Sequence, residues 1–375
     1  MKGSDLNSIA ELLDQIEDNV APDDDPNLDD LAPLWITSEP GLGKTALVGQ
    51  LCERHDWGLV QAQFEENVDL TGIPDISGER TAFMKPELFH QVEELAKTKE
   101  VVLLYIDEAA KIRSDAHKNF YTLLNEKQVA PHNPLPDNVK LILTSNLMEH
   151  GAISDQEIPP AVLNRIGFHN FTGPTPEEWL SYAASASVHP VVTSFLAENG
   201  DKLIQFDPNS DELDATPRSW SNLGRSLAKK EKRWAKNDKE ITALTVETEA
   251  MAYLPKSIAK ELVAHFAFEN EIPKLKDIAQ DPENTEMPKN ISAGFYLSYR
   301  MAFALNEDNA ASFRSFMEKS ENIEVKSTFD KAVDKMGKAD MLADAVSDLS
   351  KEEKEKAHEN IMDTVIGTTT RSTRR

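Results

Sequence analysis

The stretch SEPGLGKTAL, residues 38–47, carries the clearest structural signal in the chain. It follows LAPLWIT at 31–37, an apolar run typical of a buried strand, and it opens a helical stretch over 44–55. Gly41 and Gly43 let the backbone curl so that successive N–H groups point inward, and the helix start adds a partial positive charge. A strand, a glycine-rich turn and a helix in this order predict a phosphate-binding loop.

Two side chains at the end of this loop extend the prediction to a nucleotide and its metal ion. Lys44 can reach the β- and γ-phosphates, and the Thr45 hydroxyl can bind Mg²⁺. The usual pattern is GxxxxGK[ST], and Ser38 stands here at the first glycine position, which is a mild departure. We expect the whole loop and the helix start to contact nucleotide: Glu39, Pro40, Gly41, Leu42, Gly43, Lys44, Thr45 and Ala46.

Two acidic residues, Asp107 and Glu108, follow the apolar run VVLLYI at 101–106. In a fold built around a phosphate loop, we expect this strand to lie beside the strand that carries the loop. Asp107 would hold Mg²⁺, and Glu108 would be the general base that polarises an attacking water. Acids often end strands, so this interpretation depends on the phosphate loop upstream.

Three further side chains are candidates for the surroundings of the γ-phosphate. Asn146 follows the buried run at 139–145, where its amide could bridge the attacking water and the phosphate; the alternative is a simple turn residue. Arg165 and Arg218 could each stabilise the charge that builds on the phosphate during transfer. An arginine at a subunit rim would act on the neighbouring subunit, and one on a helical lid would act on its own nucleotide. Isolated arginines are otherwise surface or ion-pair residues.

The alternation of apolar runs divides the chain into four parts. Residues 1–30 form an acidic segment with a short helix. Its strongly acidic stretch at 11–30 is either a solvated connector or a docking segment for a basic partner. Residues 31–172 alternate strands and helices, which predicts an α/β core with a parallel sheet and flanking helices. Residues 173–325 predict a helical lid and helical extension, and 326–375 a charged helical C-terminus with a basic tail.

Residues 64–89 predict a small insert within the α/β core. Gly78 lies between two short strand-like pieces, as in a hairpin. Phe83, Met84 and Lys85 are candidates for contact with a threaded or docked protein. The alternative is that Phe83 packs the insert onto the domain and that Lys85 is solvated.

The composition limits the classes of function. The chain holds 40 Lys+Arg and 65 Asp+Glu, a net charge of −25, which disfavours coating nucleic acid by bulk charge but leaves room for a local basic channel. The single cysteine, Cys52, excludes an intramolecular disulfide, and we expect it to be buried. No run approaches the roughly 20 apolar residues of a membrane span. The N-terminus lacks the apolar region of a secretory signal, so we expect a cytoplasmic protein with no membrane partner.

The order of these motifs resembles the AAA+ ATPases and, within them, the MoxR-like group found in bacteria and phages. The segment at 38–45 is similar to the family's Walker A motif, and that at 105–129 to its Walker B stretch, with Asp107 and Glu108 in place. On this resemblance, Asn146 is sensor 1, Arg165 is the arginine finger acting in trans, and Arg218 is sensor 2 acting in cis. The resemblance covers about residues 31–235, with Ile166 standing where the family more often has Phe.

The resemblance implies an ATPase with ATP and Mg²⁺ as cofactors, in a bacterial or phage-infected cell. Members usually assemble into hexameric rings with nucleotide between subunits. They use hydrolysis to remodel a protein partner, often one with a von Willebrand factor A-type domain. The alternative is a DNA-associated AAA+ motor or loader of helicase-like type, which DNA would stimulate in a salt-dependent way. A third possibility, a scaffold with little turnover, is disfavoured by the intact Glu108.

Overall fold

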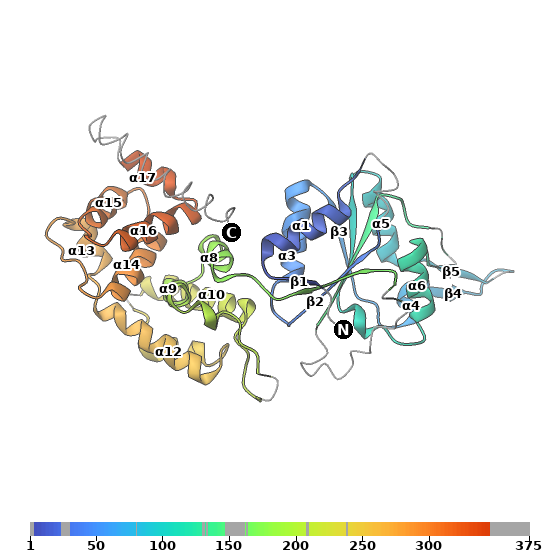
Figure 1. Cartoon of the computed structure of the whole chain (residues 1–375), viewed down its shortest axis with the longest axis horizontal. Helices are drawn as coiled ribbons and strands as arrows, with labels where there is room; N and C mark the ends of the chain where they lie inside the picture. Colours follow the sequence, from blue (N-terminus) through green and yellow to red (C-terminus); the bar gives the residue numbers. More distant parts are fainter. Residues whose placement is uncertain are drawn as a thin grey trace. The chain divides into compact units, whose positions relative to one another are not determined.

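The structure is a computed structural model that describes residues 4–23, 31–79, 81–129, 132, 134–146, 162, 164–207, 210–237 and 239–345. The chain divides into two compact units, residues 1–175 and 176–375. The first is built on a β-sheet with helices on both faces, and the second is helical (Figure 1). Each unit has a hydrophobic core of its own.

Among the described residues of the first unit, the sheet has six strands, and all of its neighbouring pairs are parallel. The predicted α/β fold with a parallel sheet and a helical C-terminal region is therefore confirmed. Parallel strands buried on both faces explain the nearly continuous apolar runs in the sequence. In spatial order the strands are β1 (Ser4–Leu6), β8 (Gly167–Phe171), β2 (Leu34–Ser38), β7 (Val139–Asn146), β6 (Val102–Ile106) and β3 (Gly58–Ala62).

The strand order corrects one expectation. We expected β6, which leads to Asp107, to lie beside β2, which leads to the phosphate loop, and this is wrong. Strand β7 lies between them and pairs with both. The physical reason is burial: β7 is the longest strand, and its first seven residues are all buried, which suits a position with a hydrogen-bonded neighbour on each side.

The N-terminal segment contributes a strand and a helix to this unit. β1 pairs with β8 at the sheet edge, with Leu6 opposite Phe171. Helix α1 (Ile9–Val20) starts at the Ser8 cap, and Leu12, Leu13, Ile16 and Val20 are buried. The short helix was predicted in this segment, whereas a three-residue strand is too short to show a periodicity in the sequence. The acidic residues 24–30 lie outside the described part of the chain.

Helices cover both faces of the sheet (Figure 1). Helices α1 and α3 (Lys44–His55) contact each other on one face. On the other face lie α4 (Asn67–Thr71), α5 (Glu87–Ala96) and α6 (His117–Glu126). The core beneath this second group includes Leu104, Ile106, Leu141 and Leu143. Because side chains alternate along a strand, Tyr105 and Thr144 belong to the opposite face, which α3 covers.

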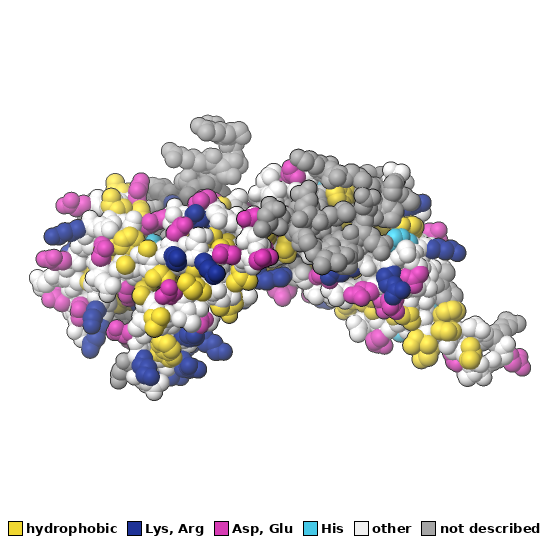
Figure 2. Space-filling model, turned by 90° about the horizontal axis from the view of Figure 1, so that it is seen from below, with side chains coloured by type: hydrophobic (Ala, Val, Ile, Leu, Met, Phe, Trp, Pro, Cys, Tyr) yellow, Lys and Arg dark blue, Asp and Glu magenta, His cyan; other side chains and the backbone are white. Residues whose placement is uncertain are grey.

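The predicted insert forms a two-stranded antiparallel hairpin of β4 (Ile73–Asp75) and β5 (Ala82–Met84). Its apolar side chains are exposed, and they form the yellow patch on the projecting hairpin in Figure 2. Phe83 is 39% exposed and Met84 is 65% exposed, so neither is packed away in the domain. Lys85, in contrast, is held by an ion pair with Glu93 on α5 and is not simply solvated.

Within its described residues, the second unit is built from helices joined by loops, with one isolated β-bridge between Gln205 and Ala215, and it has two cores that meet at α14. Tyr296 faces one core and Leu297 the other. Residues after 325 do not form only a charged surface, because Phe329 and Val333 are buried in the second core. The helices are α8 (Pro176–Ser185), α9 (Pro190–Glu198), α10 (Pro217–Ala235), α11 (Ala243–Ala250), α12 (Lys256–Phe266), α13 (Leu275–Gln280), α14 (Ile291–Ala304), α15 (Ala310–Glu318), α16 (Ile323–Lys335) and α17 (Ala339–Ala345).

None of the helices in the described part of the chain combines the length and the apolar character needed to cross a bilayer. The lone thiol, Cys52, is buried on α3 as expected, and burial raises its pKa to about 11. A thiol with so high a pKa is a poor nucleophile at neutral pH, so Cys52 fills space in the core.

Candidate nucleotide site

The loop between β2 and α3 has the backbone needed to surround a phosphate. Gly41 and Gly43 have φ values of 82° and 94°, in the left-handed region that glycine adopts without strain. Gly43 is the N-cap of α3, and no side chain of the described residues caps this end of the helix. The N–H groups at a helix start point along the helix axis, where the helix dipole favours a negatively charged ligand.

Ser38 proves to be a structural part of the loop. It is fully buried at the end of β2. Its hydroxyl accepts a hydrogen bond from the Lys44 ammonium group and donates one to the carbonyl of Glu39, at 2.7 Å. A glycine at this position could do neither, so Ser38 links the Lys44 side chain to the start of the loop.

Asp107 is fixed at the end of β6 by three hydrogen bonds. Its backbone N–H donates to the carbonyl of Ala62, at 2.8 Å. Its Oδ1 atom accepts from the Thr144 hydroxyl at 2.8 Å and from the Glu108 N–H at 3.0 Å. Because these hydrogen bonds hold Oδ1 in place, the direction in which Oδ2 of Asp107 points is fixed as well.

Glu108 lies in the turn that leads into the 3₁₀ helix η1 (Ala109–Lys111). Its φ of 52° is in the left-handed region, which is uncommon for a side chain of this size. Lys111 Nζ lies 2.7 Å from Glu108 Oε2, and the two side chains are 32% and 33% exposed. The turn and the ion pair orient Glu108 while leaving it open to water, as a general base requires.

The parallel sheet brings the predicted groups to one edge. Asn146 ends β7 directly opposite Ser38, the last residue of β2. Asp107 and Glu108 follow β6, which is the other neighbour of β7. Since the carboxyl ends of parallel strands meet at one edge, the phosphate loop, the acidic pair and Asn146 lie together there. Such an edge is where ligands bind in α/β folds.

Two side chains at this site, Tyr105 and Thr144, were missed by sequence reasoning. The Tyr105 hydroxyl lies 3.1 Å from Thr45 Oγ1 and 2.9 Å from Thr144 Oγ1. Burial raises the pKa of Tyr105 to about 12. A tyrosine within an otherwise aliphatic strand was the available signal, because a buried phenol needs a hydrogen-bond partner.

Arg165 lies at the opposite end of the sheet, where the strands begin. It precedes β8, whose first residue, Gly167, is paired with Leu34 at the start of β2. The phosphate loop follows the far end of β2, and a five-residue strand separates its two ends by roughly 13 Å. The Arg165 guanidinium donates from Nε to Asn125 Oδ1, at 3.0 Å. Arg165 is therefore placed away from the phosphate loop of its own chain.

Arg218 belongs to the helical unit. It is exposed in the first turn of α10, where Thr216 and Ser219 form a capping box and Pro217 occupies the first helical position. This cap fixes the start of the helix and hence the position from which the Arg218 side chain projects.

The oxygen atoms at the site suit Mg²⁺. The Thr45 hydroxyl and the Asp107 carboxylate are hard oxygen ligands, which this ion prefers, and it commonly takes its other ligands from water and nucleotide phosphates. Through Tyr105 and Thr144 the two are also linked by hydrogen bonds. A bound Mg²⁺ would supply positive charge to the β- and γ-phosphates.

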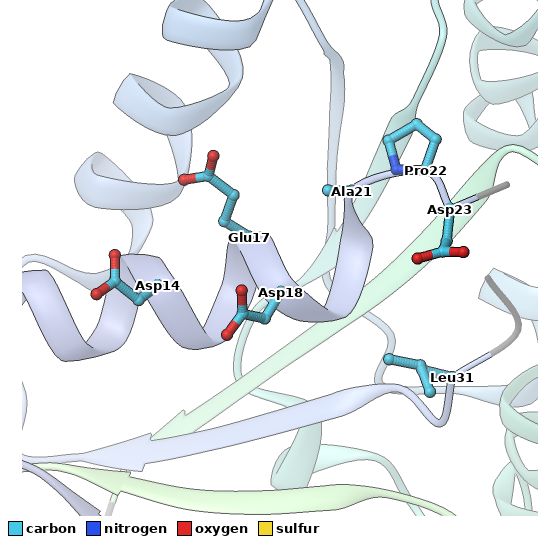
Figure 3. Close-up of a pocket in the computed structure, with 7 residues that line it drawn as sticks. All are labelled: Asp14, Glu17, Asp18, Ala21, Pro22, Asp23 and Leu31. Carbon is cyan, nitrogen blue, oxygen red and sulfur yellow. The ribbon is translucent and has the colours of Figure 1, made fainter. Parts of the chain in front are cut away.

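A second concave region, on α1, has the wrong charge for a nucleotide. Figure 3 shows carboxylates along α1 and at Asp23, with Leu31 beside them. Such a pocket repels phosphate groups. Its charge suits a basic partner, one of the two alternatives for the N-terminal segment. The lining residues are Asp14, Glu17, Asp18, Ala21, Pro22, Asp23 and Leu31.

No protein-family model matches the sequence. No curated protein matches it either. Among solved structures, the chain is similar to a single-residue mutant of RuvB from Thermotoga maritima, with 14% identity, a TM-score of 0.35, and 67% of this chain and 70% of that one covered. It is also similar to NtrX from Brucella abortus in complex with ADP, with 13% identity, a TM-score of 0.41, and 95% and 68% covered. Similarities this low support no inference about function, so function is inferred from the residues of the site.

Proposed function

We propose that this chain is an ATPase of the AAA+ class that binds MgATP and hydrolyses it to ADP and phosphate. The observation that carries the proposal is the convergence of four features at one edge of the parallel sheet: the phosphate loop, the Asp107 carboxylate, the half-exposed Glu108 and Asn146. Each has the chemistry that phosphoryl transfer to water needs.

The roles follow from position and chemical type. The loop N–H groups and Lys44 bind the phosphates, and Thr45 and Asp107 hold the metal ion. Glu108 accepts the proton of the attacking water, and Asn146 orients that water against the γ-phosphate. Pre-placed donors and a positioned base are how such sites accelerate hydrolysis, because little covalent chemistry falls to the protein.

We propose further that the working form is a ring, with Arg165 completing the site of the neighbouring subunit. The support is its place at the sheet edge opposite its own phosphate loop. Arg218 would contact nucleotide in cis from the helical unit and couple hydrolysis to movement of that unit. Hexameric assembly is the form that the resemblance to MoxR-like proteins implies.

The proposed output is remodelling of a protein partner, as in MoxR-like ATPases. A partner with a von Willebrand factor A-type domain is the expectation from that resemblance. The exposed Phe83 and Met84 of the β4–β5 hairpin support contact with a protein, because exposed apolar side chains gathered on a projecting element often mark an interaction surface. The net charge of −25 disfavours DNA as the partner.

The direct test compares ATP binding and hydrolysis in three proteins: the native chain, Lys44→Ala and Glu108→Gln. We expect Lys44→Ala to lose both, and Glu108→Gln to bind ATP while its hydrolysis falls by about 100-fold or more. Hydrolysis that persists in Glu108→Gln would overturn the assignment of the base. Stimulation by DNA that disappears with rising salt would favour the DNA-associated alternative over protein remodelling.

A further inference from the structure

We propose that Tyr105 and Thr144 form a hydrogen-bond relay that orients both metal-binding side chains of the site. This inference rests on the proposed function, since it concerns how Thr45 and Asp107 are prepared for MgATP. The relay runs from the Thr45 hydroxyl through Tyr105 and Thr144 to Asp107, with heavy-atom distances of 3.1, 2.9 and 2.8 Å.

The sheet register makes the relay possible. Tyr105 on β6 is paired with Ile142 on β7, so Thr144 lies two residues further along the same face. Asp107 follows β6 by one residue and reaches Thr144 from the same side. Thr45, in the first turn of α3, approaches this face from the helix that covers it. The four side chains come from β6, the residue that follows it, β7 and α3.

The direction of the relay follows from counting protons. An ionised carboxylate only accepts hydrogen bonds, so Thr144 must donate its one proton to Asp107. Thr144 then accepts from the Tyr105 hydroxyl, which has one proton to donate, as phenols do at neutral pH. The Tyr105 oxygen in turn accepts from Thr45. Each hydroxyl group of the relay therefore donates one hydrogen bond, and each has a partner.

This direction has a consequence at each end. The proton of Thr45 points toward Tyr105, which leaves the lone pairs of Thr45 Oγ1 for a metal ion. At the other end, both hydrogen bonds to the Asp107 side chain fall on Oδ1. Oδ2 accepts none from the described residues, which leaves this oxygen for the waters around the ion. The relay thus sets the ligand direction at both positions before nucleotide binds.

The test measures ADP binding at equilibrium, first in EDTA and then across a titration of Mg²⁺, so that no turnover is needed. The variants are Tyr105→Phe and Thr144→Val, which break the relay, and Thr144→Ser, which keeps the hydroxyl. Thr37→Val is the matched control, because Thr37 is also a buried threonine of this sheet but donates to the carbonyl of His169.

We expect both relay-breaking variants to need at least about tenfold more Mg²⁺ to reach the same tightening of ADP binding. This is the usual cost of losing a group that orients a metal ligand. ADP affinity in EDTA should stay within about twofold of the native value, and Thr144→Ser and Thr37→Val should behave as the native chain does. An unchanged Mg²⁺ requirement, or an equal loss of affinity with and without Mg²⁺, would overturn the relay. If the native chain binds no ADP under either condition, the proposed function fails instead.

Discussion

His265 offers a quantitative test of the helical unit through pH. It is 6% exposed, and its Nε2 atom lies 2.8 Å from the Ser194 hydroxyl oxygen. The rings of Phe195, Phe268 and Tyr296 surround it at centroid distances of 5.6, 5.2 and 5.8 Å. Burial among these groups lowers its pKa from 6.5 to about 4. Folding therefore holds this imidazole neutral at pH values where the unfolded chain would protonate it.

The sign and size of the effect follow from the two pKa values. Because the folded pKa is the lower one, the contribution is complete above pH 6.5 and is lost as pH falls from there to about 4. The full loss corresponds to about 3 kcal/mol of the free energy of unfolding, and about 1.4 kcal/mol of it is gone at pH 5.5. The cause is the cost of burying an imidazolium group among aromatic rings.

The assay is native-state hydrogen exchange, corrected for the intrinsic effect of pH, in peptides from α12 and α14. Lowering the pH from 7.5 to 5.5 should reduce the stability advantage of the native chain over His265→Gln by about 1.4 kcal/mol. The control His90→Gln, which removes a histidine that is 54% exposed, should keep the native pH dependence. An identical pH dependence in His265→Gln and the native chain would refute the reasoning.

Two other substitutions probe the α/β unit. At Gly72, where φ is 74°, a Cβ would lie 1.8 Å from the carbonyl oxygen of Met84, so Gly72→Ala should increase hydrogen exchange in the β4–β5 hairpin. The control Gly49→Ala, on α3 with open space around it, should not. Equal exchange in the two variants would contradict the predicted clash. Lys111→Met removes the half-exposed ion pair with Glu108, a contact worth about 1 kcal/mol at most. The ATPase kcat should therefore fall by no more than about fivefold. A loss as large as that of Glu108→Gln would mean that Lys111 does more than orient the base.

The local elements around the candidate site could be predicted from the sequence. A glycine-rich turn followed by Lys44 and Thr45 has few structural uses. The apolar runs at 31–37, 101–106 and 139–145 mark β2, β6 and β7, because buried parallel strands are apolar on both faces. The hairpin was also visible, from the short strand-like pieces around Gly78. In these cases the residues that determine the conformation are close in the chain.

What could not be predicted depends on contacts between distant residues. The place of β7 between β2 and β6 is a property of the whole sheet, and so the expected neighbour of the phosphate-loop strand was wrong. The contact of Tyr105 with Thr144 needs the register of two strands that are far apart in sequence. The hydrogen bond between Arg165 and Asn125 likewise joins residues that are 40 positions apart in the chain.

The central claim, that active sites are shared between subunits, is tested most directly by ATPase rate per subunit against protein concentration. Samples of the native chain alone and mixed with Arg165→Ala are compared over a range that spans assembly. A shared site predicts that the rate per subunit rises with concentration, and that the native rate falls when the arginine variant is mixed in. A rate that is independent of concentration and indifferent to Arg165→Ala would contradict the claim and leave Arg165 as a structural partner of Asn125.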